Sequence, residues 1–519
     1  MSTPPHSANE ATLSDLIDSA ATRFGNHCAI SSDGTTLTYS ELQKRASELA
    51  TALRDSGIDR NSVVGVQLNR SIDAVVAIHA VVITEAVVAP LEPGDPPART
   101  SAIVESSAIS HILTDRASTD LPGWKYHETA MISSLTLSET GHIPPAQASE
   151  AAYLLSTSGS TGTPKGVLLS DSAVHHFIRW AADRVGLTDT DRIAAQSALT
   201  FDLSTFDLFA AAHAGAAHVV LPNWLKAFPS DIADWLNANA ITTMYAVPTL
   251  LRGIAQHLPN TESGRLPTLR TVVYAGEPYP AAALAELTAA LPGVEIHNFY
   301  GPTETNVCTA EVISRDWHPG EAVSIGAPID GMHAVPVDAE LMPCDEGELV
   351  VAGPQLLTGY LSGGVLTDPT VPVRYPDGVT RRSYRTGDLA RRGSDGRLYL
   401  LGRADSQVKR RGYRIELDGI AAIAGATDGV HAAAAVATGP ENRITLFLDL
   451  GDTDAETGRP RVADALRAQL PATHQPDDIV CLPSLPVTVR GKVDRSQLAD
   501  IAARRGTHPH HYETEGAGT

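Results

Sequence analysis

One stretch of the chain combines glycines, hydroxyl side chains and a lysine at close spacing. Residues 154–167 are Leu-Leu-Ser-Thr-Ser-Gly-Ser-Thr-Gly-Thr-Pro-Lys-Gly-Val, and the apolar run at 153–155 predicts a buried strand leading into them. Glycines let the backbone turn its N–H groups toward a phosphate, while the hydroxyls and Lys165 add donors and positive charge. The spacing of a Walker A loop is absent. A flexible loop is the simpler alternative, but the flanking strand, proline and lysine favour a loop that binds a nucleoside triphosphate.

Two further stretches place polar side chains where the chain turns. Residues 298–305 hold an aromatic ring, a Gly-Pro turn and a carboxylate after an apolar run, which is where open α/β sheets bind ligands. Tyr300 could stack on a base and Glu304 could hold Mg²⁺; a plain turn with a solvated glutamate is the alternative. Residues 384–389 place Asp388 after a tight turn, which suits either a ribose diol or an ordinary turn.

Basic stretches follow toward the C-terminus. Residues 402–416 contain Arg403, Asp405 and a short basic run that, taken alone, is typical of a solvated hairpin. Residues 490–495 set Lys492 in a tight loop, although a lone lysine is usually solvated. Neither stretch identifies a site by itself.

The stretch 201–207, Phe-Asp-Leu-Ser-Thr-Phe-Asp, sets an aspartate among apolar neighbours. Burying an unpaired carboxylate costs on the order of several kcal/mol. Asp202 is therefore expected to meet a cation, and an amino group is one candidate. The competing interpretation is that Asp202 caps the helix that follows it.

Apolar periodicity predicts the elements that must position these side chains. Apolar residues recur at helical spacing over 40–56, which predicts an amphipathic helix. Alternation of helices with short apolar strands predicts a layered α/β domain with parallel strands. The expected strands are 63–68, 87–91, 218–221, 243–247, 271–275, 294–298 and 347–352, and further helices are expected at 74–82 and 281–291. The polar segments 138–149 and 441–460 are expected to contain loops.

Composition limits the class of protein. The chain has 519 residues, too many for a single core, so two or more domains are expected. Its net charge of −21 argues against a nucleic-acid partner, which requires a basic surface. The four cysteines are widely separated in the sequence, which argues against metal ligation and against a disulfide framework. No secretory signal and no membrane span is visible, so a cytoplasmic protein is expected.

Taken together and in this order, these stretches resemble the adenylation domains of nonribosomal peptide synthetases. Those domains belong to the superfamily of acyl-CoA synthetases, adenylation domains and luciferases. The resemblance covers about residues 10–505 and includes residues 37–42 and 347–361. It implies an α/β fold with a large N-terminal core of layered α/β subdomains plus a β-rich part, residues 1–403. A small, mobile α+β domain at 404–505, hinged at Asp405, and a disordered tail at 506–519 complete the expected organisation.

The resemblance also implies a reaction. ATP, with Mg²⁺, converts a carboxylate into an acyl-adenylate with release of pyrophosphate, and the acyl group then passes to a thiol. Thr303, Glu304 and Lys492 are the implied catalytic residues, with Glu304 holding Mg²⁺ and Lys492 offsetting negative charge on the reacting oxygens. The implied ATP-binding residues are Thr157, Ser158, Gly159, Ser160, Thr161, Gly162, Lys165, Gly276, Glu277, Asn298, Tyr300, Asp388 and Arg403.

Asp202 decides the expected substrate class, because members that activate amino acids pair this position with the α-ammonium group. The implied wall of the substrate site consists of Leu203, Phe206, Ala246, Val273, Ala275, Phe299, Val307 and Cys308. This wall carries no charge, and its two phenylalanines take up volume. A small or medium aliphatic amino acid is therefore expected: alanine, 2-aminobutyrate, valine or proline.

No carrier-protein motif follows Lys492, so the chain resembles a free-standing adenylation enzyme. Its expected partner is a discrete peptidyl or acyl carrier protein, whose phosphopantetheine thiol accepts the acyl group. One rival is an acyl- or aryl-CoA synthetase, against which Asp202 argues. Another is a non-catalytic scaffold, against which Lys165, Glu304, Asp388 and Lys492 argue.

Overall fold

The computed structural model describes residues 12–115, 127–132, 134–157, 159, 163–258, 266–314, 317–319, 321–451, 453–487 and 493–506. The chain divides into two compact units. Unit 1 comprises residues 1–93, 100–157 and 164–404, and unit 2 comprises residues 94–99, 158–163 and 405–519.

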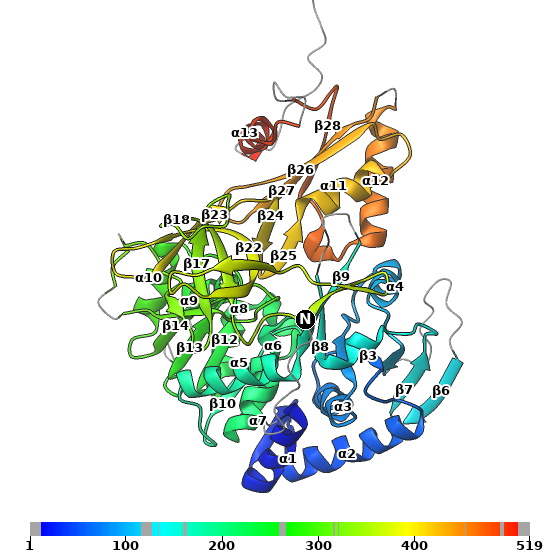
Figure 1. The fold of residues 1–519 in the computed structure, drawn as a ribbon, viewed down its shortest axis with the longest axis vertical. Coiled ribbons are helices and arrows are strands. Elements are labelled where there is room, and N and C mark those ends of the chain that lie inside the picture. The colour runs from blue at the N-terminus through cyan, green and yellow to red at the C-terminus, as the bar shows by residue number, and fades with distance from the viewer. Residues whose placement is uncertain are drawn as a thin grey trace, which may run out of the picture. The chain divides into compact units, whose positions relative to one another are not determined.

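The first sheet of unit 1 has nine strands, in the order β16-β15-β14-β13-β12-β10-β11-β1-β2. Four of them, β14, β13, β12 and β10, are labelled in Figure 1. Its central strands pair in parallel, and β2, β15 and β16 pair in antiparallel fashion at the edges. The bounds are β1 Cys28–Ser32, β2 Thr35–Thr38, β10 Arg192–Ala195, β11 Ala217–Val220, β12 Thr243–Ala246, β13 Thr271–Tyr274, β14 Glu295–Tyr300, β15 Thr309–Val312 and β16 Ala327–Pro328.

A second nine-stranded sheet in the same unit has the order β20-β19-β9-β8-β4-β3-β5-β7-β6. Strands β3, β4, β5 and β8 are parallel neighbours. The bounds are β3 Val63–Gln67, β4 Val87–Pro90, β5 His111–Thr114, β6 His127–Ile132, β7 Leu135–Glu139, β8 Ala151–Thr157, β9 Lys165–Ser170, β19 Gly359–Ser362 and β20 Val365–Thr367, with a 3₁₀ turn at Ala146–Glu150.

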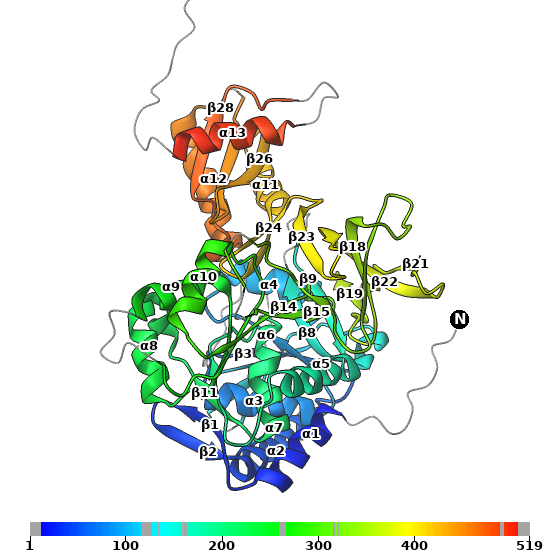
Figure 2. The same cartoon turned by 90° about the vertical axis from the view of Figure 1, so that its left-hand side faces the viewer.

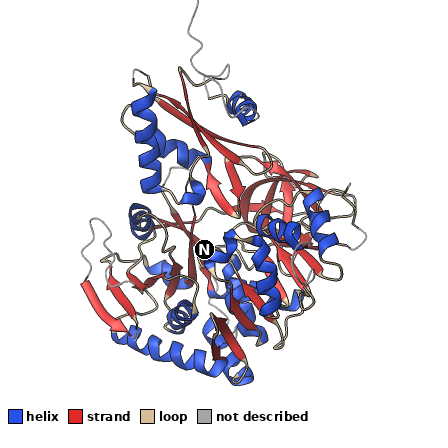
Figure 3. Cartoon of the chain, turned by 180° about the vertical axis from the view of Figure 1, so that it is seen from behind, coloured by secondary structure: helices blue, strands red, loops and turns tan. Residues whose placement is uncertain are grey.

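Helices cover both faces of the first sheet (Figure 3). On one face α8, α9 and α10 close a core of their own with the sheet. The other face shares a larger core with the second sheet and the helices between them. The bounds are α1 Leu13–Phe24, α2 Tyr39–Asp55, α3 Ile72–Ile83, α4 Pro97–Ser106, α5 Asp171–Arg184, α6 Leu203–Thr205, a π-helix at Phe206–Ala210, α7 Ala211–Ala214, a 3₁₀ turn at Asn223–Ala227, α8 Pro229–Ala238, α9 Pro248–His257 and α10 Ala281–Ala290. None of the helices in the described ranges is long and apolar enough to cross a membrane.

A third, five-stranded sheet completes unit 1 with β17, β18, β22 and β21 in that order and β23 beside β22 (Figure 2). The bounds are β17 His333–Val337, β18 Glu346–Ala352, β21 Val371–Arg374, β22 Thr380–Arg392 and β23 Leu398–Arg403. The long strand β22 carries Asp388, which therefore sits on regular structure rather than in a turn.

Unit 2 is a small α+β body. Strands β24 and β25 form a hairpin, and β26, β27 and β28 form a three-stranded sheet that packs against helices through two apolar clusters. The bounds are β24 Gln407–Arg410, β25 Tyr413–Glu416, α11 Leu417–Gly425, β26 Ala432–Thr438, β27 Arg443–Asp449, α12 Ala455–Gln469, a 3₁₀ turn at Ala472–His474, β28 Asp478–Leu482 and α13 Arg495–Gly506.

The expected layered α/β architecture with a β-rich part is confirmed. Helix α2 shows why local sequence was informative. The Thr38 side chain accepts a hydrogen bond from the Glu41 N–H, and the Glu41 side chain accepts one from the Thr38 N–H. This capping box fixes the start of the helix. Residues 441–460, which were predicted to contain a loop, do so between β27 and α12. The rest of the segment belongs mainly to these two elements, because the apolar run at 444–448 fills the core of unit 2.

Candidate active site

The candidate residues of unit 1 gather where the parallel strands of the first sheet end. The carboxyl ends of β10, β12, β13 and β14 lead into the segments that carry Asp202, Ala275 and Glu304. Because these strands are parallel neighbours, their carboxyl ends lie along one edge of the sheet. This edge is where open α/β sheets bind ligands.

A buried hydrogen-bonded network joins β14 to the third sheet. The Tyr300 hydroxyl donates to Asp388 Oδ2 at 2.5 Å, and Arg403 Nη1 donates to Asp388 Oδ1 at 2.9 Å and to the Thr386 carbonyl at 3.0 Å. Asp388 is only 5% exposed. Burial, together with the neighbouring Asp388 carboxylate, raises the pKa of Tyr300 well above its ordinary value, so the phenol stays a donor. Three of the predicted ATP-binding residues thus meet around one carboxylate.

A second network surrounds Glu304, which is completely buried. The Tyr360 hydroxyl donates to Glu304 Oε1 at 2.5 Å and lies 2.9 Å from the Tyr384 hydroxyl. Lys165 Nζ lies 3.9 Å from the centre of the Tyr360 ring, a cation–π distance. Tyr360 therefore links the predicted phosphate-binding lysine to the predicted metal-binding carboxylate. Sequence reasoning gave Tyr360 and Tyr384 no role, although both lie in stretches that carried the resemblance.

The loop that carries Thr303 and Glu304 depends on a glycine. A Cβ added at Gly301 would lie 1.6 Å from the Asn306 carbonyl oxygen, and Asn306 itself has a positive φ of 51°. The loop closes through hydrogen bonds from the Thr305 N–H to the Pro302 carbonyl and from the Cys308 N–H to the Tyr300 carbonyl. Close approach of two backbone segments is what requires glycine here.

Replacing Gly301 with alanine should therefore displace the 301–308 loop and lower the free energy of unfolding by about 3 kcal/mol, the upper range for overpacking. The melting temperature and the activity should both fall. Gly425→Ala is the matched control, since an added Cβ there meets nothing within 4 Å. Equal melting temperatures for the two variants would contradict the steric argument.

Buried aromatic rings pack on the same face of the sheet. Phe206 and Phe299 both contact Tyr245 edge-to-face, with ring centres 5.4 and 5.8 Å apart, and Trp180 lies 4.9 Å from Phe299. We call Phe206, Tyr245, Phe299 and Trp180 the aromatic cluster. The other predicted wall residues that belong to the same core are Leu203, Val273, Ala275, Val307 and Cys308.

The structure does not place Ala246 with these residues. Ala246 belongs to the separate core beneath α8–α10, while its neighbour Tyr245 pairs with Val273 and faces the aromatic cluster. Successive side chains of a strand point to opposite faces of the sheet, so Tyr245 and Ala246 lie on opposite faces of β12. Tyr245, to which sequence reasoning gave no role, therefore shares a core with the other predicted wall residues, and Ala246 does not.

Asp202 and Asp207 differ in burial. Asp202 is half-buried at the start of α6, and its carboxylate accepts a hydrogen bond from the Leu203 N–H at 2.9 Å. Asp207, at 2% exposed, is the fully buried carboxyl of this stretch. The hydrogen bond from the Leu203 N–H supports the capping interpretation of Asp202.

The remaining candidates are placed as follows. Asn298 is buried and donates to the Ser324 carbonyl at 2.7 Å, Gly276 has a φ of 91°, and Glu277 accepts from the Thr249 N–H at 2.7 Å. Thr157 ends β8, Gly159 follows it, and Asp405 is exposed at the start of the main segment of unit 2. Ser158, Ser160, Thr161, Gly162 and Lys492 lie outside the described residues, as do residues 507–519 of the expected tail.

Comparison with known proteins identifies the family. The sequence profile described as AMP-binding enzyme matches residues 17–361. The chain belongs to this family. It is 30% identical over 514 residues to zwittermicin A synthase ZmaJ of Bacillus cereus, covering 96% of both chains. It is 32% identical over 514 residues to L-proline--[L-prolyl-carrier protein] ligase of Streptomyces coelicolor, covering 91% of this chain and 93% of that protein. Other curated relatives are far longer, and the chain spans 8% to 19% of several of them.

Solved structures share the fold of this chain. The structure of IdnL1 aligns with a TM-score of 0.78 at 25% identity, over 92% of this chain and 99% of that one. Holo-PA1221, an NRPS protein containing adenylation and PCP domains, aligns with a TM-score of 0.77 at 22% identity, over 94% of this chain and 84% of that one. The expected resemblance to adenylation domains is confirmed, and the AMP-binding family member described here is an adenylate-forming ligase.

Proposed function

We propose that this ligase activates a small or medium aliphatic α-amino acid, of the alanine, 2-aminobutyrate, valine or proline type. In the first step a carboxylate oxygen of the amino acid attacks the α-phosphorus of ATP, and pyrophosphate leaves. In the second step the phosphopantetheine thiolate of a separate carrier protein attacks the carbonyl of the adenylate, and AMP leaves. The observation that carries the proposal is the juxtaposition of Asp202 with an uncharged aromatic cluster one helical turn away.

Asp202 supports an amino-acid substrate because a half-buried carboxylate attracts an ammonium group more strongly than a solvated one does. The aromatic cluster supports a small side chain. Phe206, Tyr245 and Phe299 are all buried and rigidly packed edge-to-face, which leaves them little freedom to withdraw from a bulky substrate. One methylene in such surroundings discriminates by about 1–3 kcal/mol, so several related amino acids should be accepted.

For ATP, we assign Asp388 to the ribose hydroxyls, with Tyr300 and Arg403 fixing its two oxygens. Lys165 would bind the β- and γ-phosphates. Glu304 fits a Mg²⁺ site, since one buried carboxylate combined with substrate phosphates and water is the donor set that Mg²⁺ prefers. When bound, Mg²⁺ would supply charge neutralisation at the phosphates. Thr303, Asn298, Gly276 and Glu277 line the remaining ATP-binding positions in this proposal.

Amino-acid-dependent exchange of labelled pyrophosphate into ATP, across a panel of amino acids and their desamino analogues, tests the first step. Signal with small aliphatic amino acids is expected. Signal only with acids that lack the amino group would overturn the proposal and favour a CoA ligase. For the second step, the loaded acyl group should appear on a phosphopantetheinylated carrier protein and not on free CoA; the reverse result would contradict the proposed partner.

A further inference from the structure

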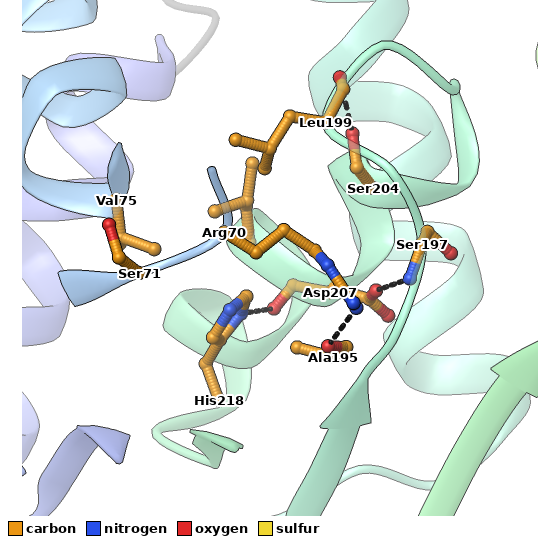
Figure 4. A pocket seen from close by; sticks show the side chains of 10 residues that line it. Arg70, Ser71, Val75, Ala195, Ser197, Leu199, Ser204, Asp207 and His218 are labelled. Atoms are coloured by element: carbon orange, nitrogen blue, oxygen red, sulfur yellow. Dashed lines mark hydrogen bonds between the residues drawn. The ribbon is translucent and has the colours of Figure 1, made fainter. Parts of the chain in front are cut away.

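A small cavity lies beneath the π-helix, on the side of the first sheet that faces α3 (Figure 4). Its polar lining comes from Arg70, Ser71, Ser197, Ser204, Asp207 and His218. The volume of the cavity is about 10 Å³. That is close to the smallest volume that holds one water molecule.

Asp207 presents an unsatisfied oxygen to this cavity. Its Oδ2 accepts a long hydrogen bond from the Ser197 N–H at 3.4 Å, and its backbone carbonyl accepts from His218 Nδ1 at 2.8 Å. Its Oδ1 is buried and has no hydrogen-bond partner among the described residues. Leaving a buried polar atom without a partner costs roughly 1–3 kcal/mol, so a bridging water is strongly favoured there.

Nearby basic side chains do not keep the Asp207 carboxyl ionised at neutral pH. Arg70 and Lys226 both act to lower the pKa of Asp207, but burial outweighs them and raises it to about 8. The carboxyl is therefore largely protonated at neutral pH and both donates and accepts hydrogen bonds. A neutral acid beside the Arg70 guanidinium is a poor site for a cation. A single water, which can accept from one group and donate to another, suits this surrounding.

The cavity wall includes the backbone that carries the proposed substrate residues. The Ser204 hydroxyl donates to the Leu199 and Phe201 carbonyls at 3.1 and 2.6 Å, and the Asp207–Ser197 bond ties the π-helix to the start of the same segment. Asp202 lies within this segment, and Phe206 directly precedes Asp207. A π-helix is a rare conformation that is frequently found at functional sites.

We propose that the cavity holds one ordered water bound to Asp207 Oδ1, and that Asp207 and this water position the turn that carries Asp202 and Phe206. Asp207 is thus a positioning residue for the amino-acid site, and this part of the inference rests on the proposed function. Arg70, whose Nη1 donates to the Ala195 carbonyl at 2.8 Å, closes the other side of the cavity and supplies a second polar contact for the water.

Three variants test the positioning role. Asp207→Leu keeps the approximate size of the side chain but removes all its polar contacts. It should raise the KM for the amino acid about tenfold, which corresponds to the loss of about one hydrogen bond. The KM for ATP should not change. Asp207→Asn retains a donor and an acceptor and should stay near the wild-type KM. Asp191→Asn is the control for general destabilisation, because Asp191 is 3% exposed and paired with Arg270 at the opposite ends of the strands.

A merely structural role for Asp207 predicts that Asp207→Leu resembles Asp191→Asn, with a lower melting temperature and an unchanged KM for the amino acid. That result would overturn the positioning role. A high-resolution crystal structure of the wild type should show a water within hydrogen-bond distance of Asp207 Oδ1, and an empty cavity would overturn the water site.

If no amino acid supports exchange of labelled pyrophosphate into ATP in the wild type, the proposed function fails. The inference that Asp207 positions the turn is then tested by hydrogen exchange. Hydrogen exchange of residues 197–210 should then be faster in Asp207→Leu than in Asp207→Asn. Equal exchange in both variants would overturn the inference without reference to any substrate.

Discussion

Replacing Lys492 with alanine should lower the rate of adenylate formation by about 100- to 1,000-fold, the usual effect of removing one preorganised group that stabilises developing charge. We propose Lys492 as the group that offsets negative charge as the carboxylate attacks the α-phosphate. This reaction makes few covalent demands on the protein, so charge stabilisation and positioning account for most of the catalysis. Pyrophosphate exchange with the preferred amino acid measures the effect.

The second half-reaction provides the internal check. Thioester formation from a supplied aminoacyl-adenylate should stay near the wild-type rate in Lys492→Ala, because the role proposed for Lys492 is confined to the attack of the carboxylate on the α-phosphorus. Lys44→Ala, at an exposed lysine of α2, is the control for loss of one positive charge. Unchanged adenylate formation in Lys492→Ala would refute the role, and equal losses in both half-reactions would indicate a structural effect.

Replacing Asp202 with alanine should lower kcat/KM for the amino acid about 100-fold while leaving the KM for ATP unchanged. Truncating one partner of a desolvated charge pair typically costs about 2–5 kcal/mol. The carboxylate of Asp202 is half-buried, so the lower part of that range applies.

The desamino analogue of the preferred amino acid makes this test specific. Wild type should favour the amino acid strongly, whereas Asp202→Ala should accept the amino acid and its analogue almost equally. Asp202→Asn separates charge from capping, since its amide oxygen can still accept from the Leu203 N–H. An Asp202→Ala variant that keeps its preference for the amino acid would rule out ammonium pairing.

Local patterns predicted the layered sheets well because apolar strands and capped helices carry their own signals. The strands expected at 63–68 and 243–247 became β3 and β12, within one residue at each end. The face toward which each side chain of β12 points was harder to predict. Tyr245 and Ala246 are adjacent, and only the pairing of β12 with β13 shows which of them shares a face with Val273.

Burial was harder still to predict within residues 201–207. The expected cost of a buried carboxylate was assigned to Asp202, but the structure buries Asp207 instead. Both aspartates have apolar neighbours in the sequence, so this pattern does not distinguish them. Asp207 lies within the π-helix, whose five residues are all buried. The network of Tyr360, Tyr384 and Glu304 joins three segments far apart in the sequence, and no local pattern predicts such contacts.

The aromatic cluster has a consequence for attempts to redesign the substrate preference. Its rings belong to the same continuous core as α3, α5 and the second sheet, so they support the architecture as well as bounding the amino-acid site. Trimming Phe206 or Phe299 to admit a larger substrate would remove packing on the order of 3–5 kcal/mol per ring. A substitution that broadens the substrate range would therefore also lower the thermal stability. Successful redesign should need compensating substitutions elsewhere in that core.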